Sequence, residues 1–327
     1  MPRALTALGV VAVLTAAAAA GHWYWKDDDR PPITDILGPQ PGDLTPGLDV
    51  LDNVRNYGLD VDLPYRFRTD SNGFRGTNHG AGGGPRLLIL GDSFAFGMGV
   101  DDGATFPEQL EAALRPERAT VFNAGVPGYT ITDQLELWDA KLHAFPVEVV
   151  VLCHTASDIP EMGRPTSLRR FLAWDDEQPA TDPGVAAVAQ TFESKREAAV
   201  AHWTVPAEER LRRFGARAPA VFAQWQVAWL ETVTELAKRV KGAGKVFVVV
   251  LWVEGYGHFS AHVSPLMASL RQLDVPVFRG QGALAASGVR ATDLYLPDKH
   301  FSSSGNALAA HQTADWLRRV LASSRVF

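Results

Sequence analysis

The feature of this sequence that most restricts its fold is a series of short apolar runs that alternate with helix-length segments. The runs lie near residues 87–90, 120–122, 147–152, 245–252 and 275–278. The segments with helical periodicity cover about 102–114, 132–145, 222–240, 262–273 and 304–321. Continuous apolar runs of this length are typical of strands buried on both faces. The alternation predicts an α/β fold with a five-stranded parallel sheet that is covered by helices on both faces.

The first apolar run ends in a candidate nucleophile. Leu87–Leu90 is followed by Gly91, a residue type that tolerates the sharp turn needed at the end of a strand. Asp92 and Ser93 then lie at the carboxyl edge of the sheet, where open α/β folds bind their ligands. By themselves these two residues favour a turn that caps the next helix. A serine becomes a nucleophile only beside a base, so the assignment depends on finding one.

A candidate base lies near the other end of the chain, just before the closing helix. The segment reads Asp298-Lys299-His300, and in an extended segment residues i and i+2 point to the same side. The Asp298 carboxylate would then accept a hydrogen bond from the imidazole and fix its tautomer, so that the other ring nitrogen faces the serine. The alternative is a solvated loop with an incidental aspartate and histidine.

Three segments, in this order and each after a predicted strand or before the closing helix, resemble motifs of the GDSL/SGNH hydrolase family. They are Gly91-Asp92-Ser93-Phe94, Asn123-Ala124-Gly125-Val126-Pro127-Gly128-Tyr129 and Asp298-Lys299-His300. The resemblance covers roughly residues 65–320. It implies a flavodoxin-like three-layer α/β/α sandwich, for which we expect the strand order 2-1-3-4-5. It also implies a serine that attacks an ester, with its aspartate and histidine on one loop near the C-terminus.

The resemblance also implies an oxyanion hole, and here the chain departs from the family. Two expected donors are the backbone N–H groups of Ser93 and Gly125, and the third is an asparagine side chain after the third strand. The family slot that usually reads Gly-x-Asn-Asp reads Thr155-Ala156-Ser157-Asp158 in this sequence. Ser157 can donate a hydrogen bond, but its hydroxyl reaches less far than an amide. Either Ser157 serves through a shifted backbone, or another group such as His154 or Asn123 substitutes for it, or the enzyme is slow. Of these we predict Ser157 as the third donor.

An apolar segment at the N-terminus predicts export. Ala4–Ala20 carries no charge and is followed by the aromatic residues Trp23-Tyr24-Trp25. Seventeen helical residues span about 25 Å, and the aromatic residues extend this length to that of a bilayer core. Residues 1–30 are therefore either a signal anchor or a signal peptide cleaved at an A-x-A-like site in Ala18–Ala20. Both alternatives place the body outside the cytoplasm, membrane-anchored facing the periplasm or cell exterior, or secreted.

The rest of the chain divides by composition. Residues 31–84 form a linker and N-terminal extension rich in proline and glycine, with an edge strand near Tyr65–Arg68. Asn72–Gly76 is predicted as a turn packed against the body. Residues 85–327 form the hydrolase-like domain, in which the dense charge and prolines of about 160–216 predict a helical insertion, either above the sheet or as a solvated helical excursion.

Charge and local motifs restrict the partners of the protein. The formal net charge is −6 and the sequence pI is about 5.9, without a strongly basic segment, so we expect no nucleic acid partner. No CxxC or HExxH pattern occurs, and we expect neither a metal site nor a cofactor. Cys153 is the single cysteine and ends an apolar run, so it is predicted to be a small buried hydrophobic residue.

Three functions are compatible with the predicted site. The first is a serine esterase that uses Ser93, His300 and Asp298 on an acyl ester, such as an O-acyl group on a carbohydrate or lipid. The second is an O-acyltransferase with the same triad, and the third is a non-catalytic binding module of the cell envelope. The intact triad argues against the third. Aromatic residues near strand ends, although more often core, are candidates to line a sugar or acyl site: Phe94, Tyr129, Trp252 and Tyr256.

If Ser157 donates to the oxyanion, Ser157→Ala should lower kcat with little change in KM, because the oxyanion exists only in the transition state. Removal of one such donor typically costs about 10²–10³ in kcat. The family's asparagine at this position should hold or raise activity, provided the loop accommodates the longer side chain. Steady-state kinetics test this. A wild-type kcat in Ser157→Ala would remove Ser157 from the site, and His154 and Asn123 are the nearby substitutes to test next.

Overall fold

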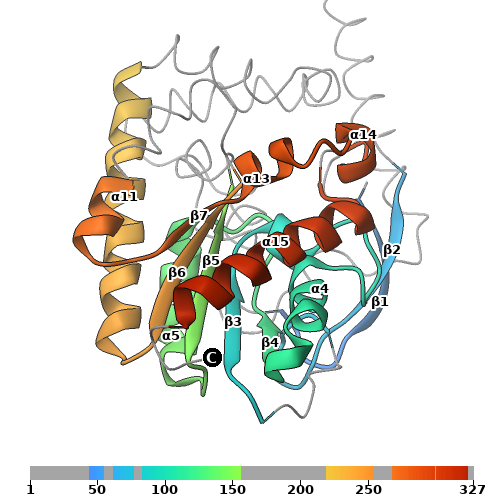
Figure 1. Ribbon diagram of the computed structural model, residues 1–327, viewed down its shortest axis with the longest axis horizontal. Helices are drawn as coiled ribbons and strands as arrows, with labels where there is room; N and C mark the ends of the chain where they lie inside the picture. The colour runs from blue at the N-terminus through green and yellow to red at the C-terminus, as the bar shows by residue number, and fades with distance from the viewer. Residues whose placement is uncertain are drawn as a thin grey trace, which may run out of the picture. The chain divides into compact units, whose positions relative to one another are not determined.

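The computed structural model describes residues 44–54, 62–76, 83–155, 219–252, 267–298 and 300–322, which Figure 1 draws as ribbon. The predicted targeting segment 1–30 and helical insertion 160–216 lie outside these residues. Within them, no helix combines the length and the apolar character needed to cross a membrane.

Five parallel strands form the central sheet of the described chain, in the order β4-β3-β5-β6-β7 (Figure 1). The strands are β3 (Arg86–Leu90), β4 (Thr120–Asn123), β5 (Val149–His154), β6 (Val246–Leu251) and β7 (Val277–Arg279). In chain order this arrangement is 2-1-3-4-5, so the predicted direction and order are confirmed. Leu90 pairs with Leu152, and His154 pairs with Leu251, so the carboxyl ends of β3, β5 and β6 lie along one edge.

The central strands are apolar on both faces because helices cover both. Successive side chains of a strand point to opposite faces. Accordingly, Leu88 and Leu90 belong to one hydrophobic cluster, whereas Leu87 and Ile89 belong to the other. Cys153 is 1% exposed, as predicted, and burial raises the pKa of its thiol.

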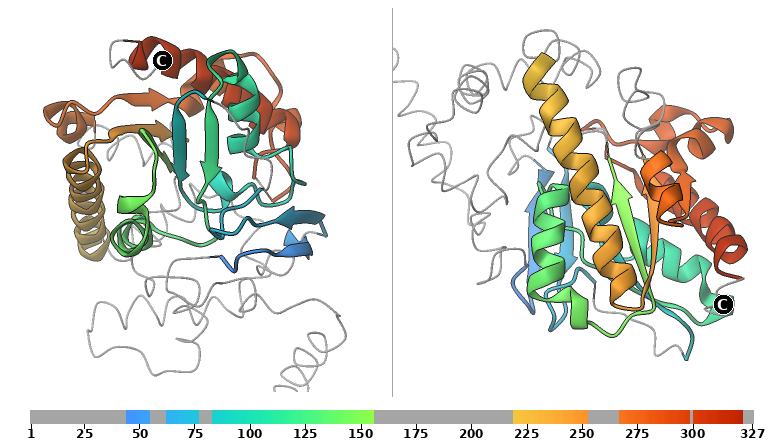
Figure 2. Two further views of the ribbon diagram at one scale, coloured as in Figure 1. Left: turned by 90° about the horizontal axis from the view of Figure 1, so that it is seen from below. Right: turned by 90° about the vertical axis from the view of Figure 1, so that its left-hand side faces the viewer.

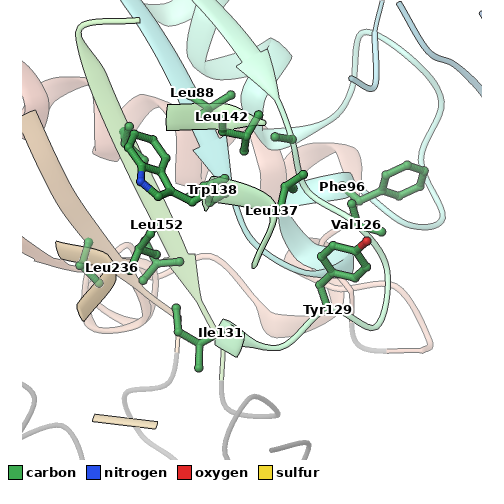
Figure 3. Packing of buried hydrophobic residues seen from close by; sticks show 14 of the residues in the cluster. Leu88, Phe96, Val126, Tyr129, Ile131, Leu137, Trp138, Leu142, Leu152 and Leu236 are labelled. Carbon is green, nitrogen blue, oxygen red and sulfur yellow. The ribbon is translucent and has the colours of Figure 1, made fainter. Parts of the chain in front are cut away.

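Two pairs of helices complete the three layers (Figures 1 and 2). Residues of α5 (Ile131–Ala140) and α11 (Pro219–Gly242) join the cluster that contains Leu88. Residues of α4 (Phe106–Ala113) and α15 (Ser303–Leu321) join the cluster that contains Leu87. Figure 3 shows Leu88, Trp138 of α5 and Leu142 among the side chains of the first cluster. The arrangement agrees with the predicted α/β/α sandwich.

Several helix boundaries differ from those predicted. Helix α4 begins at Phe106, not at residue 102, because Thr105 and Glu108 form a capping box that fixes the first turn. Helix α15 begins at Ser303, not at residue 304, because its N-cap is Ser302, whose hydroxyl accepts from Gly305 N (3.1 Å). The helix expected over 262–273 is described only from residue 267 and is helical over 267–272. Three short helices were not predicted: α3 (Ser93–Phe96), α13 (Gly280–Ala286) and α14 (Ala291–Leu294).

A two-stranded antiparallel hairpin lies beside the sheet on the β4 side (Figure 1). It consists of β1 (Asp49–Asn53) and β2 (Pro64–Arg68), and β2 covers the strand predicted near 65–68. The segment 72–76 forms the predicted turn, since the Asp70 carboxylate accepts from the backbone N–H of Asn72 and Phe74. After the turn, the backbone bridges to the last residue of β4.

The turn after β3 is made by a glycine that has no room for a side chain. A Cβ atom on Gly91 would lie 2.6 Å from Ala95 Cβ and 3.0 Å from the Cys153 carbonyl oxygen. Both distances are shorter than ordinary contacts, so α3 can lie this close to the end of β5 only because residue 91 is glycine.

Gly91→Ala is therefore expected to lower the free energy of unfolding by about 1–3 kcal/mol, the usual cost of overpacking a core. Gly242→Ala is the matched control, because a Cβ atom at Gly242 meets no atom within 4 Å at the end of α11. Urea unfolding of the two variants measures the difference. Equal free energies of unfolding for the two variants would show that α3 can move away from residue 91 at little cost.

Candidate active site

Ser93 is the first residue of α3 and follows directly on the turn at the end of β3. Asp92 is the N-cap of this helix, and its carboxylate accepts from the Phe94 backbone N–H (2.9 Å). The same carboxylate accepts from the Thr155 hydroxyl, at the end of β5 (2.5 Å). Gly97 ends the helix in the left-handed conformation (φ 90°). Ser93 is thus held at the carboxyl edge of the sheet by contacts from two strands.

The structure brings Ser93, His300 and Asp298 together. His300 Nε2 lies 2.7 Å from Ser93 Oγ, and His300 Nδ1 lies 2.7 Å from Asp298 Oδ2. The Asp298 side chain is fully buried, whereas the His300 side chain is 12% exposed. The three residues predicted to form a triad therefore have the connectivity of one, although they come from opposite ends of the domain.

A turn, and not the extended segment expected from the sequence, places Asp298 beside His300. The Oδ1 atom of Asp298 accepts from the His300 backbone N–H (3.2 Å), as aspartates in turns commonly do. The Leu296 N–H donates to the His300 carbonyl (2.8 Å) and closes the turn. The Phe94 ring packs on the imidazole with the ring centroids 4.9 Å apart. This contact helps to orient the imidazole, in addition to its two hydrogen bonds. Lys299 lies outside the described residues.

The two backbone N–H groups predicted to donate to the oxyanion, those of Ser93 and Gly125, differ in their hydrogen-bond acceptors in this structure. The Ser93 N–H has no acceptor among the described residues, as is usual for the first turn of a helix. The Gly125 N–H donates to Asn123 Oδ1 (3.0 Å). A Cβ atom on Gly125 would lie 2.4 Å from Phe96 N, so this loop lies directly against α3. The two donors therefore come from adjacent segments.

Asn123 does not replace the family asparagine in this structure. It is 1% exposed and uses both ends of its amide, since Nδ2 donates to the Phe96 carbonyl (3.2 Å) and Oδ1 accepts from Gly125. Ser157, the predicted third donor, lies outside the described residues. Thr155 is a contact that the sequence analysis missed. The sequence signal was a threonine at position 155, where the family motif has glycine, and the structure shows its hydroxyl donating to the Asp92 carboxylate.

Two of the four aromatic residues proposed to line the site belong to the core. Trp252 is 4% exposed and packs edge-on against Phe106 and Phe301. Tyr129 is 1% exposed within the cluster that Figure 3 shows. Phe94 alone, among the described candidates, contacts a triad residue. Tyr256 lies outside the described residues.

His154 is the other histidine close to the strand ends, and its surroundings differ from those of His300. It is 2% exposed, and its ring lies 4.3 Å from the Trp229 ring of α11. Burial lowers the pKa of His154 to about 3, outweighing the opposite effect of the Asp92 charge. The residue is therefore neutral and packed in the core, which argues against its use as the base. The other alternative, His258, lies outside the described residues.

The arrangement suits nucleophilic catalysis by serine. A hydroxyl within hydrogen-bond reach of an imidazole, which is in turn held by a carboxylate, is the common geometry of serine nucleophiles on unrelated folds. Three His, Cys, Asp or Glu side chains placed to hold a metal ion do not occur together in the described part of the chain.

No protein-family model and no curated protein matches the sequence. Similar solved structures include a G-D-S-L family lipolytic protein from Veillonella parvula, 12% identical, covering 72% of this chain and 98% of that chain with a TM-score of 0.44. An acetylxylan esterase from Geobacillus stearothermophilus is 14% identical and covers 73% of this chain and 95% of that chain, with a TM-score of 0.44. An α/β hydrolase enzyme from the metagenome of Lake Arreo, Spain, is 15% identical and covers 71% and 94%, with a TM-score of 0.43.

Acidification is expected to destabilise the protein through His154. The unfolded chain binds a proton below the ordinary histidine pKa of 6.5, whereas the folded chain, with a His154 pKa of about 3, does not. This contribution to stability is therefore complete above pH 6.5 and is lost as the pH falls toward 3. Each pH unit in this window corresponds to about 1.4 kcal/mol, or about 3 kcal/mol at pH 4.5.

The measurement is the urea unfolding free energy of wild type and His154→Phe between pH 7 and pH 4.5. The variant keeps a ring against Trp229 but cannot bind the proton, so its stability should fall less. His311→Phe, on the exposed face of α15, is the control and should follow wild type. A His154→Phe curve as steep as the wild-type curve would assign the acid sensitivity to other groups.

Proposed function

We propose that this protein is a serine esterase in which Ser93 is the nucleophile, His300 the base and Asp298 the residue that orients the base. The single observation that supports this most strongly is the pair of 2.7 Å contacts that joins Ser93 Oγ, the two His300 ring nitrogens and Asp298 Oδ2. Asp298 orients His300, and His300 is placed to accept the Ser93 proton. Serine is a weak nucleophile unless a base accepts its proton.

In the proposed reaction, His300 Nε2 accepts the Ser93 proton as Oγ attacks the ester carbonyl. The tetrahedral intermediate collapses, His300 gives the proton to the departing alcohol oxygen, and the acyl group stays on Ser93. Water then attacks the acyl-serine with His300 again as the base, releasing the carboxylic acid and restoring the serine. Asp298 keeps the Nδ1 proton in place and stabilises the imidazolium that forms in each half-reaction.

The oxyanion of each tetrahedral intermediate needs donors that are already in position. The Ser93 N–H is the donor best supported, because it has no acceptor among the described residues. The Gly125 N–H is the second proposed donor, and it must share or release its bond to Asn123. Ser157 remains the proposed third donor on the basis of its place in the sequence.

The proposed substrate is an acyl ester, such as an O-acyl group on a carbohydrate or a lipid. The apolar segment within residues 1–30 supports a location outside the cytoplasm, either anchored in the membrane or secreted. An O-acyltransferase would use the same triad and differ in what attacks the acyl-serine, and a binding module would not form an acyl-serine at all.

Hydrolysis of p-nitrophenyl acetate and longer p-nitrophenyl esters tests the proposal. Ser93→Ala should lower kcat by about 10⁴–10⁶-fold, because it removes the group to which the acyl transfers. Asp298→Asn should lower kcat by about 10⁴-fold, because an amide favours the wrong imidazole tautomer. Ser304→Ala, at an exposed serine in the first turn of α15, is the control and should retain wild-type kinetics.

Labelling with a fluorophosphonate separates the alternatives. The esterase should label at Ser93 and hydrolyse the esters without an added acceptor. Labelling with turnover only when a sugar hydroxyl is supplied would identify an acyltransferase. Absence of both labelling and hydrolysis in folded wild-type protein would contradict the catalytic proposal and favour the binding module.

A further inference from the structure

The segment that follows the hairpin sends one arginine into the interior of the protein. Arg75 is 1% exposed, and its side chain is 0% exposed. Removing a charge from water is costly unless the charge is hydrogen-bonded and paired. A buried arginine is therefore expected to have hydrogen-bond acceptors and a charged partner inside the protein.

The hydrogen-bond acceptors of Arg75 lie at the end of the helix that carries Ser93 and in the loop that follows, and its Nε also lies 3.5 Å from Asp102 Oδ1. Arg75 Nη1 donates to the carbonyls of Phe96 (3.0 Å) and Gly97 (2.6 Å), and Nη2 donates to the carbonyl of Val100 (2.5 Å). The last carbonyls of a helix have no partners within it and carry its partial negative charge. A cation at this end of α3 both donates hydrogen bonds to these carbonyls and balances their partial negative charge.

The guanidinium is also held from the side of the hairpin. It lies 5.6 Å from the ring centroids of Tyr65 and Phe67 and 4.5 Å from that of Phe96. Cations over aromatic faces within about 6 Å are attracted by the ring electrons. Tyr65 and Phe67 belong to β2, so this side chain joins the hairpin to α3.

A second connection runs through Asn123, at the end of β4. The Arg75 backbone N–H donates to the Asn123 carbonyl (3.0 Å), and the Asn123 side chain donates to the same Phe96 carbonyl that Arg75 binds (3.2 Å). Asn123 also accepts from the Gly125 N–H. One carbonyl, that of Phe96, therefore joins the hairpin, the Ser93 helix and the Gly125 loop.

We propose that Arg75 is a positioning residue for the nucleophile: it fixes the end of α3 and, with Asn123, the distance between the Ser93 and Gly125 segments. The inference rests on the proposed function. Helix α3 has four residues, and a single helical turn is not stable alone. Its rigidity must come from contacts at both ends, which Asp92 supplies at the start and Arg75 at the end.

The experiment compares Arg75→Lys and Arg75→Met with the same changes at Arg66. Arg66 also belongs to the hairpin, but its side chain is 64% exposed and pairs with Asp49 at the surface. Lysine keeps the charge at position 75 but cannot reproduce the fork that reaches three carbonyls. We expect both Arg75 variants to lower kcat by about 10–100-fold with KM within about twofold, because displacement of a catalytic group by about 1 Å has effects of this size. The Arg66 variants should keep wild-type kinetics.

Hydrogen exchange supplies a readout that does not depend on ester hydrolysis. The Phe96 and Gly97 amides bond within the α3 turn, and they should exchange faster in Arg75→Lys, while the amides of β5 should not change. Faster exchange together with the selective loss of kcat supports the positioning role. A lowered melting temperature with wild-type kcat in the folded protein would overturn it.

Three other outcomes test the inference and the proposed function separately. Failure of both Arg75 variants to fold would overturn the inference, because the guanidinium would then support the whole fold and not the site. If wild-type protein neither hydrolyses the esters nor labels with fluorophosphonate, the proposed function fails whatever the Arg75 variants do. An active wild type with unaffected Arg75 variants would overturn the inference alone.

Discussion

A single helical turn carries the proposed nucleophile, and the contacts that hold this turn determine much of the surrounding structure. Four residues cannot maintain a helix in water, so α3 depends on its neighbours. Gly91 and Gly125 lack side chains where α3 approaches the backbone of β5 and of the loop after β4. Asp92 caps one end and Arg75 binds the carbonyls at the other. The sheet thus supplies the edge, and close packing supplies the rigidity.

The two histidines near this edge show that surroundings, more than residue type, decide which one is suited to catalysis. His154 ends a central strand, is almost completely buried and packs on Trp229, so its protonated form is strongly disfavoured. His300 lies on a turn beside a buried carboxylate, with a small exposed fraction and Ser93 within hydrogen-bond reach. A base must gain and lose a proton during turnover, and the Asp298 carboxylate beside His300 Nδ1 is placed to stabilise the charged form of His300.

The sequence was sufficient to predict the features that depend on hydrophobic pattern or on a short motif. Apolar runs located the strands, and the resemblance carried by the Ser93 and Asp298–His300 segments predicted that these residues lie together, although the extended segment expected from the spacing is a turn. Helix starts failed where side-chain caps decide them, as at Thr105 and Ser302, because several polar residues there were equally suitable. Three short helices have too few residues to show a periodicity. The role of Arg75 was not visible, since an arginine in a turn rich in glycine resembles a surface residue until its tertiary contacts are known.

The hydrogen bond from the Gly125 N–H to Asn123 Oδ1 affects how the proposed oxyanion hole distinguishes the transition state from the bound ester. In the absence of an oxyanion it satisfies a buried donor and keeps that N–H in a fixed direction. A neutral amide oxygen is a weaker acceptor than an alkoxide, because hydrogen bonds to charged acceptors are roughly twice as strong. The developing oxyanion would therefore compete successfully for this donor, whereas the neutral ester carbonyl would not. An interaction gained only as charge develops lowers the barrier without tightening substrate binding, so the Asn123 bond favours kcat over affinity.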